Sequence, residues 1–189
     1  SLGLVGSEMC IRDRGKNYAI VISTSCGLWR YQIGDTVKFT STNPYKFIIS
    51  GRTKSFINAF GEELIVDNAE KGLHEACKAT GAVVSEYTAA PVFMNAEGKC
   101  RHQWVIEFSQ QPADMEAFAN ALDLALQHIN SDYEAKRHKD ITLQRLEVVT
   151  ARQGLFNDWL KSKGKLGGQH KVPRLSNNRD IIDDILKLN

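Results

Sequence analysis

The segment from Gly51 to Glu63 reads Gly-Arg-Thr-Lys-Ser-Phe-Ile-Asn-Ala-Phe-Gly-Glu-Glu. It separates two parts of the chain that differ in hydrophobic pattern. Before Gly51, short apolar or alternating runs are typical of strands, and after Ser55 such runs alternate with segments of helical spacing. The sequence therefore predicts an α+β protein in which a small β-rich part precedes a larger mixed part.

The β-rich part, residues 16–50, contains three strand-like runs. Residues 18–24 and 45–50 are apolar, whereas residues 36–40 alternate between polar and apolar side chains. The short run from Trp29 to Ile33 is expected to be extended and to end in a turn at Gly34-Asp35. Because so few residues cannot bury a core of their own, we expect this part to pack against protein outside this sequence.

The larger part reads as a mixture of helices and strands in a mixed sheet. Asp67 and Glu70 predict a capping box at the start of a helix that Gly81 ends. Pro112 and Asp114 predict the start of a second long helix. The remaining predicted elements are strands at 55–59, 82–94, 101–108 and 141–149, with a turn at 95–98, and helices at 131–139, 154–163 and 179–188.

Composition excludes several classes of protein. The chain has 189 residues, 42% of them hydrophobic and 24% charged, with a net charge of +2. This balance gives no reason to expect binding to nucleic acid or to a membrane, and no apolar run is long enough to span a bilayer. The four cysteines are too widely spaced for a zinc site or a disulfide framework, so we expect no metal site, reduced thiols and a cytoplasmic location.

The first fourteen residues, SLGLVGSEMCIRDR, have neither helical nor strand periodicity. They also lack the charged start, apolar middle and cleavage site of a signal peptide. We expect residues 1–14 to be a non-native leader. The expected organisation is then a β-rich part at 15–50, a hinge at 51–55 and an α+β domain at 56–189.

Two residues, one before the hinge and one within it, have side chains suited to a nucleotide. Asp35 follows a glycine, so its carboxylate could accept two hydrogen bonds from a ribose diol. Arg52 offers a planar fork of N–H donors to a ribose or a phosphate. Taken alone, Gly34-Asp35 is more typical of a turn between strands, and Arg52 of a surface arginine.

A basic, glycine-rich tail is the third candidate site. Its sequence from Lys161 to Ser176 is KSKGKLGGQHKVPRLS, with glycines that expose backbone N–H groups and with lysines suited to a phosphate or carboxylate. The tail lacks the order of a Walker phosphate loop. Pro173 restricts the backbone beside Lys171, which is expected to hold this lysine in a defined place. A solvated basic loop is the alternative.

The three motifs GLWRYQIGD, GRTKSFINAFGEE and GGQHKVPRLSNNR, in this order, resemble the auxin-responsive Gretchen Hagen acyl-acid amido synthetase family. The resemblance covers about residues 16–189. That family belongs to the adenylate-forming enzymes, which use ATP and Mg²⁺ to convert a carboxylic acid into an acyl-adenylate. Its members then transfer the acyl group to an amine, usually that of an amino acid.

The resemblance implies a role for five residues. Asp35 corresponds to the ribose-binding aspartate of a Tyr-x-x-Gly-Asp motif, and Tyr31 at its start would line the nucleotide site. Arg52 would lie near the ribose and the hinge, with Lys54 as the hinge pivot. Lys171 corresponds to the catalytic lysine that reaches the α-phosphate and the acyl carboxylate. Its charge would stabilise the transition state of adenylation.

The resemblance also implies that this chain is only the C-terminal part of an enzyme. The phosphate-binding loop, the adenine-binding motif and the acyl pocket of the N-terminal domain have no counterpart in the sequence. We therefore expect the chain alone to be inactive, and the acyl substrate and the amine stay open. An acyl-CoA ligase and a non-catalytic α+β module for ligand binding or assembly are the alternatives.

Overall fold

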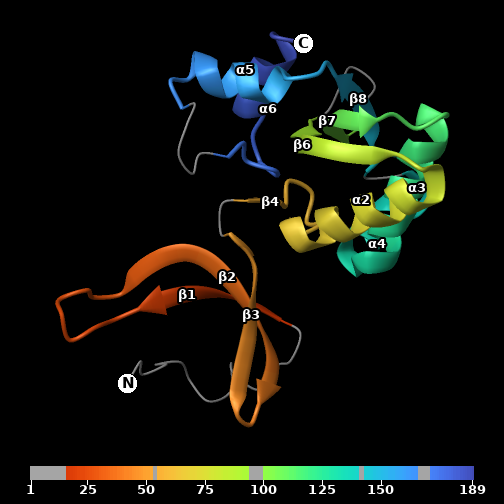
Figure 1. Ribbon diagram of the computed structural model, residues 1–189. Helices are drawn as coiled ribbons and strands as arrows, with labels where there is room; N and C mark the ends of the chain where they lie inside the picture. The colour runs from red at the N-terminus through yellow and green to blue at the C-terminus, as the bar shows by residue number, and fades with distance from the viewer. Residues whose placement is uncertain (1–15, 53–54, 94–99, 141–142, 166–170) are drawn as a thin grey trace. The chain divides into compact units, whose positions relative to one another are not determined.

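A computed structural model describes residues 16–52, 55–93, 100–140, 143–165 and 171–189 (Figure 1). The expected leader and Lys54 lie outside these ranges. The chain forms two compact units, Ser1–Lys54 and Ser55–Asn189, called unit 1 and unit 2 below.

Unit 1 contains a three-stranded antiparallel sheet in the order β1-β2-β3. Its strands are β1 (Asn17–Ile22), β2 (Tyr31–Thr42) and β3 (Tyr45–Arg52). Phe39 is the centre of a small aromatic cluster, because its buried ring makes edge contacts with Tyr18, Tyr45 and Phe47 at centroid distances of 5.9, 6.2 and 6.0 Å. The three predicted strands of this part are confirmed.

The predicted turn at Gly34-Asp35 is wrong, because β2 continues through it. Ala19 pairs with Thr36 and Val21 pairs with Gln32. Between these two pairs, β2 therefore contains more residues than β1. The surplus residues on β2 form a bulge around Gly34, whose φ of 88° is readily accessible only to glycine. A glycine and an aspartate therefore distort this strand without ending it.

Much apolar surface of unit 1 is exposed. On β3, Phe47, Ile48 and Ile49 have exposed fractions of 49%, 54% and 69%. Because successive side chains of a strand point to opposite faces, β3 exposes apolar side chains on both faces. Strands with this composition are usually buried on both sides. Unit 1 thus has too little protein of its own to cover its central apolar residues.

Unit 2 combines a mixed sheet with helices. In the order β6-β7-β8, β6 and β7 are antiparallel and β7 and β8 are parallel, while β4 and β5 form a separate two-stranded ribbon. The elements are β4 (Phe56–Ile57), β5 (Leu64–Ile65), α2 (Val66–Thr80), β6 (Val83–Val92), β7 (Arg101–Gln110), α3 (Met115–Ile129), α4 (Ser131–Arg137), η1 (His138–Asp140), β8 (Glu147–Ala151), α5 (Leu155–Ser162) and α6 (Asp180–Leu186). This is the predicted α+β class.

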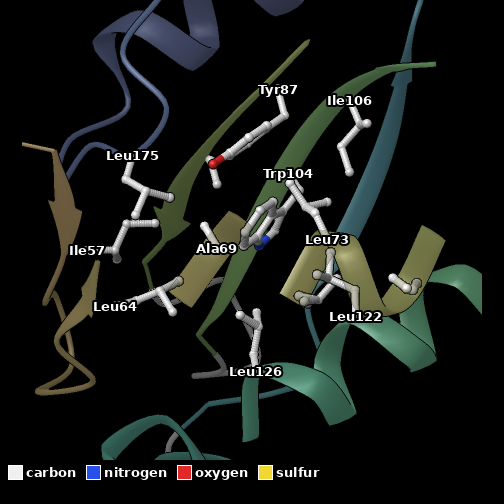
Figure 2. Packing of buried hydrophobic residues seen from close by; sticks show 14 of the residues in the cluster. Ile57, Leu64, Ala69, Leu73, Tyr87, Trp104, Ile106, Leu122, Leu126 and Leu175 are labelled. Carbon is white, nitrogen blue, oxygen red and sulfur yellow. The ribbon is translucent and has the colours of Figure 1, made fainter. Parts of the chain in front are cut away.

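Two apolar clusters form the core of unit 2, one on each face of the sheet. The first contains Trp104 with residues of α2 and α3, including Leu73 and Leu122 (Figure 2). The second contains Val105 with residues of α5 and α6. Because Trp104 and Val105 are neighbours on β7, their side chains point to opposite faces. Helices therefore cover both faces of the sheet.

Some predicted element boundaries are confirmed and others are wrong. Gly81 ends α2 with a φ of 72°, and Asp114 caps α3 by accepting from the N–H groups of Glu116 and Ala117. The capping box at Asp67 and Glu70 is wrong. Helix α2 starts two residues earlier, with Ile65 of β5 at the N-cap, and Asn68 Oδ1 instead accepts from Ile65 N–H at 3.2 Å.

The predicted strand at 141–149 begins too early, and residues 141–142 lie outside the described ranges. Strand β8 starts at Glu147, while Leu143 makes only an isolated bridge to Cys100. Leu143 and Leu146 are buried in the first cluster. These two leucines belong to a connection that packs on the core, and sequence alone does not distinguish their apolar side chains from those of a strand.

Candidate functional site

The structure brings Asp35 and Arg52 together within unit 1. They are register partners on β2 and β3, and Thr36 and Gly51 form the next pair. Asp35 lies beside the bulge at Gly34 and is half-buried. Arg52 is the last residue of β3. An acidic and a basic residue thus occupy opposite positions at one end of this ladder.

Tyr31 lies at the start of the same strand as Asp35. It pairs with Ile22 of β1, and its side chain has an exposed fraction of 53%. An exposed aromatic ring offers a flat apolar surface on which a planar group can stack. Tyr31 and Asp35 therefore belong to one strand of unit 1, on the two sides of the bulge.

Lys171 lies in unit 2 and is exposed. The segment directly after it runs beside β6. Ala89 N–H donates to Arg174 O at 2.8 Å, Ser176 N–H donates to Ala89 O at 3.1 Å, and Leu175 forms a parallel bridge with Ala89. The backbone that carries Lys171 is thus held on its C-terminal side by bonds to the sheet, not only by the restricted geometry of Pro173.

Arg174, Glu70, Glu86 and Tyr87 form a charged cluster near Lys171. Arg174 forms ion pairs with Glu70 and Glu86, and its guanidinium lies 5.2 Å from the centre of the Tyr87 ring. The Tyr87 hydroxyl donates to Glu70 Oε1 at 2.9 Å. Burial raises the pKa of Glu86, although the Tyr87 N–H and the positive charge of Lys171 act in the opposite direction.

Sequence reasoning missed this cluster. The sequence pattern places Glu86 and Tyr87 in a predicted strand and Arg174 in the basic tail, without a contact between them. Their partners lie far apart along the chain, on α2, on β6 and after α5. The sequence shows that Arg174 follows Lys171 by three residues, but this spacing does not indicate which residues Arg174 contacts.

A hollow of about 270 Å³ opens beside Lys171. Lysines, aspartates and Trp159 line it together with apolar neighbours. One of its lysines, Lys163, is engaged by Asp184 at 2.6 Å and lies 6.0 Å from the centre of the Trp159 ring. The polar lining residues are Lys163, Lys165, Lys171, Asp180 and Asp184.

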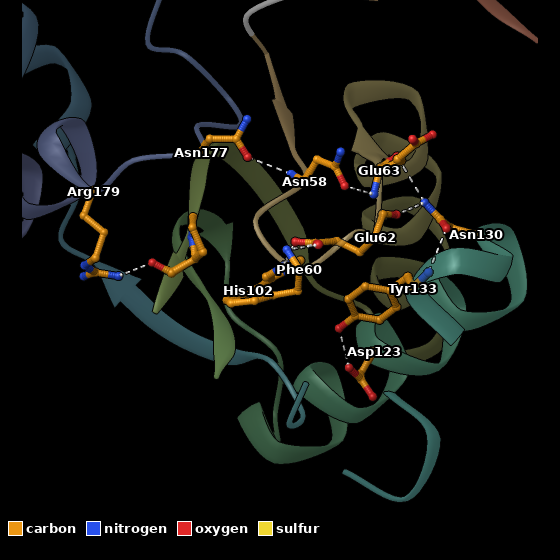
Figure 3. Close-up of polar contacts among 11 residues, drawn as sticks. Asn58, Phe60, Glu62, Glu63, His102, Asp123, Asn130, Tyr133, Asn177 and Arg179 are labelled. Atoms are coloured by element: carbon orange, nitrogen blue, oxygen red, sulfur yellow. Dashed lines mark hydrogen bonds and ion pairs between the residues drawn. The ribbon is translucent and has the colours of Figure 1, made fainter. Parts of the chain in front are cut away.

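The turn that opens unit 2 is held by polar groups (Figure 3). Glu62 Oε2 accepts from Phe60 N–H at 2.7 Å, and Glu62 Oε1 lies 2.8 Å from His102 Nε2. Asn177 Oδ1 accepts from Asn58 N–H at 2.7 Å. The chain between Asn58 and Glu62 is therefore fixed both to β7 and to the segment that follows Lys171.

The described ranges hold no cluster of three acidic, histidine or cysteine side chains that could bind a metal ion. Over the same ranges, none of the helices has the length and apolar character needed to cross a membrane. Cys26, Cys77 and Cys100 are free thiols, and burial raises the pKa of Cys77.

Two family models match the chain. The GH3 family central domain matches residues 11–52, and the GH3 family C-terminal domain matches residues 67–180. The chain belongs to the GH3 family. This confirms the resemblance to the Gretchen Hagen family that the three motifs indicated.

Curated GH3 relatives are similar to nearly the whole chain. A probable indole-3-acetic acid-amido synthetase GH3.1 of Arabidopsis thaliana is 29% identical, over 96% of this chain and 32% of its own length. A jasmonoyl–L-amino acid synthetase GH3.5 of Oryza sativa subsp. japonica is 31% identical, over 86% of this chain and 29% of its own length. The chain thus spans about a third of the relatives it matches.

Solved structures show the same fold. The GH3.15 acyl acid amido synthetase superposes with a TM-score of 0.73 at 18% identity, covering 93% of this chain and 33% of its own. A 2-hydroxyisobutyryl-CoA ligase in the postadenylation state gives a TM-score of 0.50 at 16% identity, covering 93% and 35%. The fold is that of the GH3 acyl acid amido synthetases. The roles of Tyr31, Asp35, Arg52, Lys54 and Lys171 stay predictions.

Proposed function

We propose that this chain is the C-terminal part of an ATP-dependent acyl-acid amido synthetase. The complete enzyme would form an acyl-adenylate from a carboxylic acid and transfer the acyl group to an amine such as an amino acid. The observation that carries the proposal is the match to both GH3 domain models, with the Asp35–Arg52 pair inside the first and Lys171 inside the second. The relatives named as amido synthetases support the same reaction.

Unit 1 would contribute part of the nucleotide site. The half-buried Asp35 carboxylate has two acceptor oxygens that suit the two hydroxyls of a ribose, and such charge-assisted bonds contribute about 1.5–3 kcal/mol each. The exposed ring of Tyr31 on the same strand suits contact with the nucleotide. Arg52, opposite Asp35, would add positive charge beside the ribose.

Unit 2 would contribute the catalytic lysine. As the carboxylate of the acid approaches the α-phosphate of ATP, negative charge accumulates, and the Lys171 ammonium would stabilise it in the transition state. The exposure of Lys171 leaves it accessible to a substrate held elsewhere, while the segment behind it is bonded to β6. Mg²⁺ would enter with ATP, and no residue of this chain is assigned to it.

The two units would move relative to each other about a hinge at residues 51–55, with Lys54 as its pivot. A hinge lets one site perform two half-reactions, adenylation and acyl transfer, by presenting different faces of a mobile domain. The exposed apolar residues of β3 would pack against the N-terminal domain of the complete enzyme. The free thiols fit a cytoplasmic enzyme.

The test is product identification with the complete enzyme. ATP and a panel of carboxylic acids are supplied with either amino acids or CoA, and the products are identified by mass. An acyl-amino acid with AMP release is the expected product. A thioester made only with CoA would replace the proposal by an acyl-CoA ligase, and no AMP with any acid would favour a non-catalytic module. This chain alone is expected to form neither product.

A further inference from the structure

The segment from Val172 to Asn177 lies between two strands of unit 2. On one side it is bonded to β6 through Ala89, at 2.8 and 3.1 Å. On the other side Asn177 Oδ1 accepts from the N–H of Asn58 at 2.7 Å, directly after β4 (Figure 3). Asn177 therefore connects the segment behind Lys171 to the first strand of unit 2.

Apolar packing supports the same connection. Ile57 of β4 and Leu175 of the segment have no exposed surface, and both belong to the first core cluster. Their side chains lie close together in Figure 2. Side chains in a close-packed protein interior do not slide freely past one another. The contact between these two residues therefore holds β4 and the segment together.

A second polar side chain holds the end of the segment nearest to Lys171. Thr88 of β6 has an exposed fraction of 1%, and its hydroxyl donates to Pro173 O at 2.8 Å. Pro173 is two residues from Lys171. A buried hydroxyl without a hydrogen-bond partner is destabilising, so the Thr88 hydroxyl favours conformations that keep this bond. The bond therefore holds the Pro173 carbonyl in place.

We propose that Asn177 and Thr88 are positioning residues for Lys171, and this rests on the function proposed above. Asn58 lies four residues after Lys54. The Asn58–Asn177 bond ties the chain directly after β4 to the segment behind Lys171. Thr88 ties the same segment to the sheet. Lysine has a long flexible side chain, so the position of its ammonium group depends on how firmly the backbone at Lys171 is held.

The activity test uses the complete enzyme and ATP–pyrophosphate exchange. Asn177→Ala and Thr88→Val are each expected to lower kcat of exchange about tenfold while KM for ATP changes by less than about twofold, because the bonds place a group that acts in the transition state. Asn177→Asp and Thr88→Ser keep the acceptor and the donor, and are expected to restore most of the rate. Asn178→Ala is the matched control, since among the described residues its side chain bonds to Ser176 and not to Asn58.

A structural readout separates positioning from general destabilisation. In the 189-residue chain, amide hydrogen exchange at Asn58 is expected to accelerate about tenfold in Asn177→Ala but not in Asn177→Asp or Asn178→Ala. The unfolding midpoint of Asn177→Ala should stay close to that of the unchanged chain, because the Asn58 N–H is at the surface and water can replace the lost acceptor.

The outcomes distinguish the two proposals. If Lys171→Ala abolishes exchange but Asn177→Ala and Thr88→Val keep the full rate, the positioning role is overturned and the function of Lys171 stands. Equal losses in Asn177→Ala and Asn178→Ala, or an unchanged amide exchange at Asn58, would likewise overturn it. Full activity of Lys171→Ala would remove the proposed role of Lys171 and the positioning role with it.

Discussion

Glu62 Oε1 and His102 Nε2 lie 2.8 Å apart, and neither side chain has exposed surface. The pair joins the turn before β5 to strand β7. The second oxygen of Glu62 is also engaged, by the N–H of Phe60 at 2.7 Å. The rings of Phe60 and Tyr133 lie 6.3 and 5.5 Å from that of His102. A buried carboxylate in such surroundings is stable only while its partners are present.

Removing this carboxylate should weaken unit 2 strongly. Glu62→Ala leaves both the His102 ring nitrogen and the Phe60 N–H without their acceptor, so we expect the free energy of unfolding to fall by about 3–5 kcal/mol in urea titrations. Glu75→Ala on the exposed face of α2 is the control and should change it by less than about 0.5 kcal/mol. Equal effects of the two substitutions would show that the Glu62–His102 pair contributes no particular stability.

The same carboxylate predicts a loss of stability in acid. Burial tends to raise the pKa of Glu62, but the hydrogen bond and charge of His102 and the N–H of Phe60 outweigh it, and its pKa lies below the usual 4.5. Because the unfolded chain then binds the proton more tightly than the folded chain, the stability from this group is complete above pH 4.5 and is lost as the pH falls through the folded-state pKa.

Urea titrations between about pH 6 and pH 3 measure this effect. The half-buried, ion-paired Asp158 and Asp184 also have lowered pKa values, whereas the pKa of Glu86 is raised, so the profile of the unchanged chain is a composite. Comparison with Glu62→Gln isolates the group of interest. The substituted chain should have a flatter acid limb, and parallel profiles would contradict the assignment.

Local signals were sufficient for most of the elements in unit 2. The periodicity of α2 and α3, the cap at Asp114 and the stop at Gly81 depend only on neighbouring residues, and each was predicted. The bulge at Gly34 was missed because turns and bulges use the same residue types. The capping box was misplaced because α2 follows β5 without a loop, which places Ile65 at the cap.

The contacts around Lys171 could not be predicted in the same way. Arg174 meets Glu70 and Glu86 only after α2 and β6 have packed, and Asn58 and Asn177 are 119 residues apart in the chain. The tail motif was enough to predict Lys171 itself as a candidate catalytic residue. The partners that hold its segment are set by tertiary packing, which leaves no local pattern in the sequence.

The exposed apolar surface of unit 1 predicts the behaviour of the isolated chain. Ile48 and Ile49 are among several large apolar side chains that are more than half exposed. We expect the 189-residue chain to bind a hydrophobic dye and to self-associate as its concentration rises. A monomeric chain that binds no dye would contradict this expectation.

Truncation supplies the control for that experiment. A chain that begins at Ser55 keeps both core clusters of unit 2, so it should unfold at a urea concentration close to that of the whole chain. It should also lose most of the dye binding. Dye binding that persists after truncation would place the responsible surface in unit 2.

ATP–pyrophosphate exchange by the complete enzyme measures whether Lys171 takes part in adenylation. Lys171→Ala should lower kcat of exchange by about 10²–10³-fold, because a positioned charge that stabilises the transition state is lost. Lys71→Ala, which removes an exposed lysine paired with Asp67 on α2, should leave the rate unchanged. An exchange rate for Lys171→Ala equal to that of the unchanged enzyme would contradict the account.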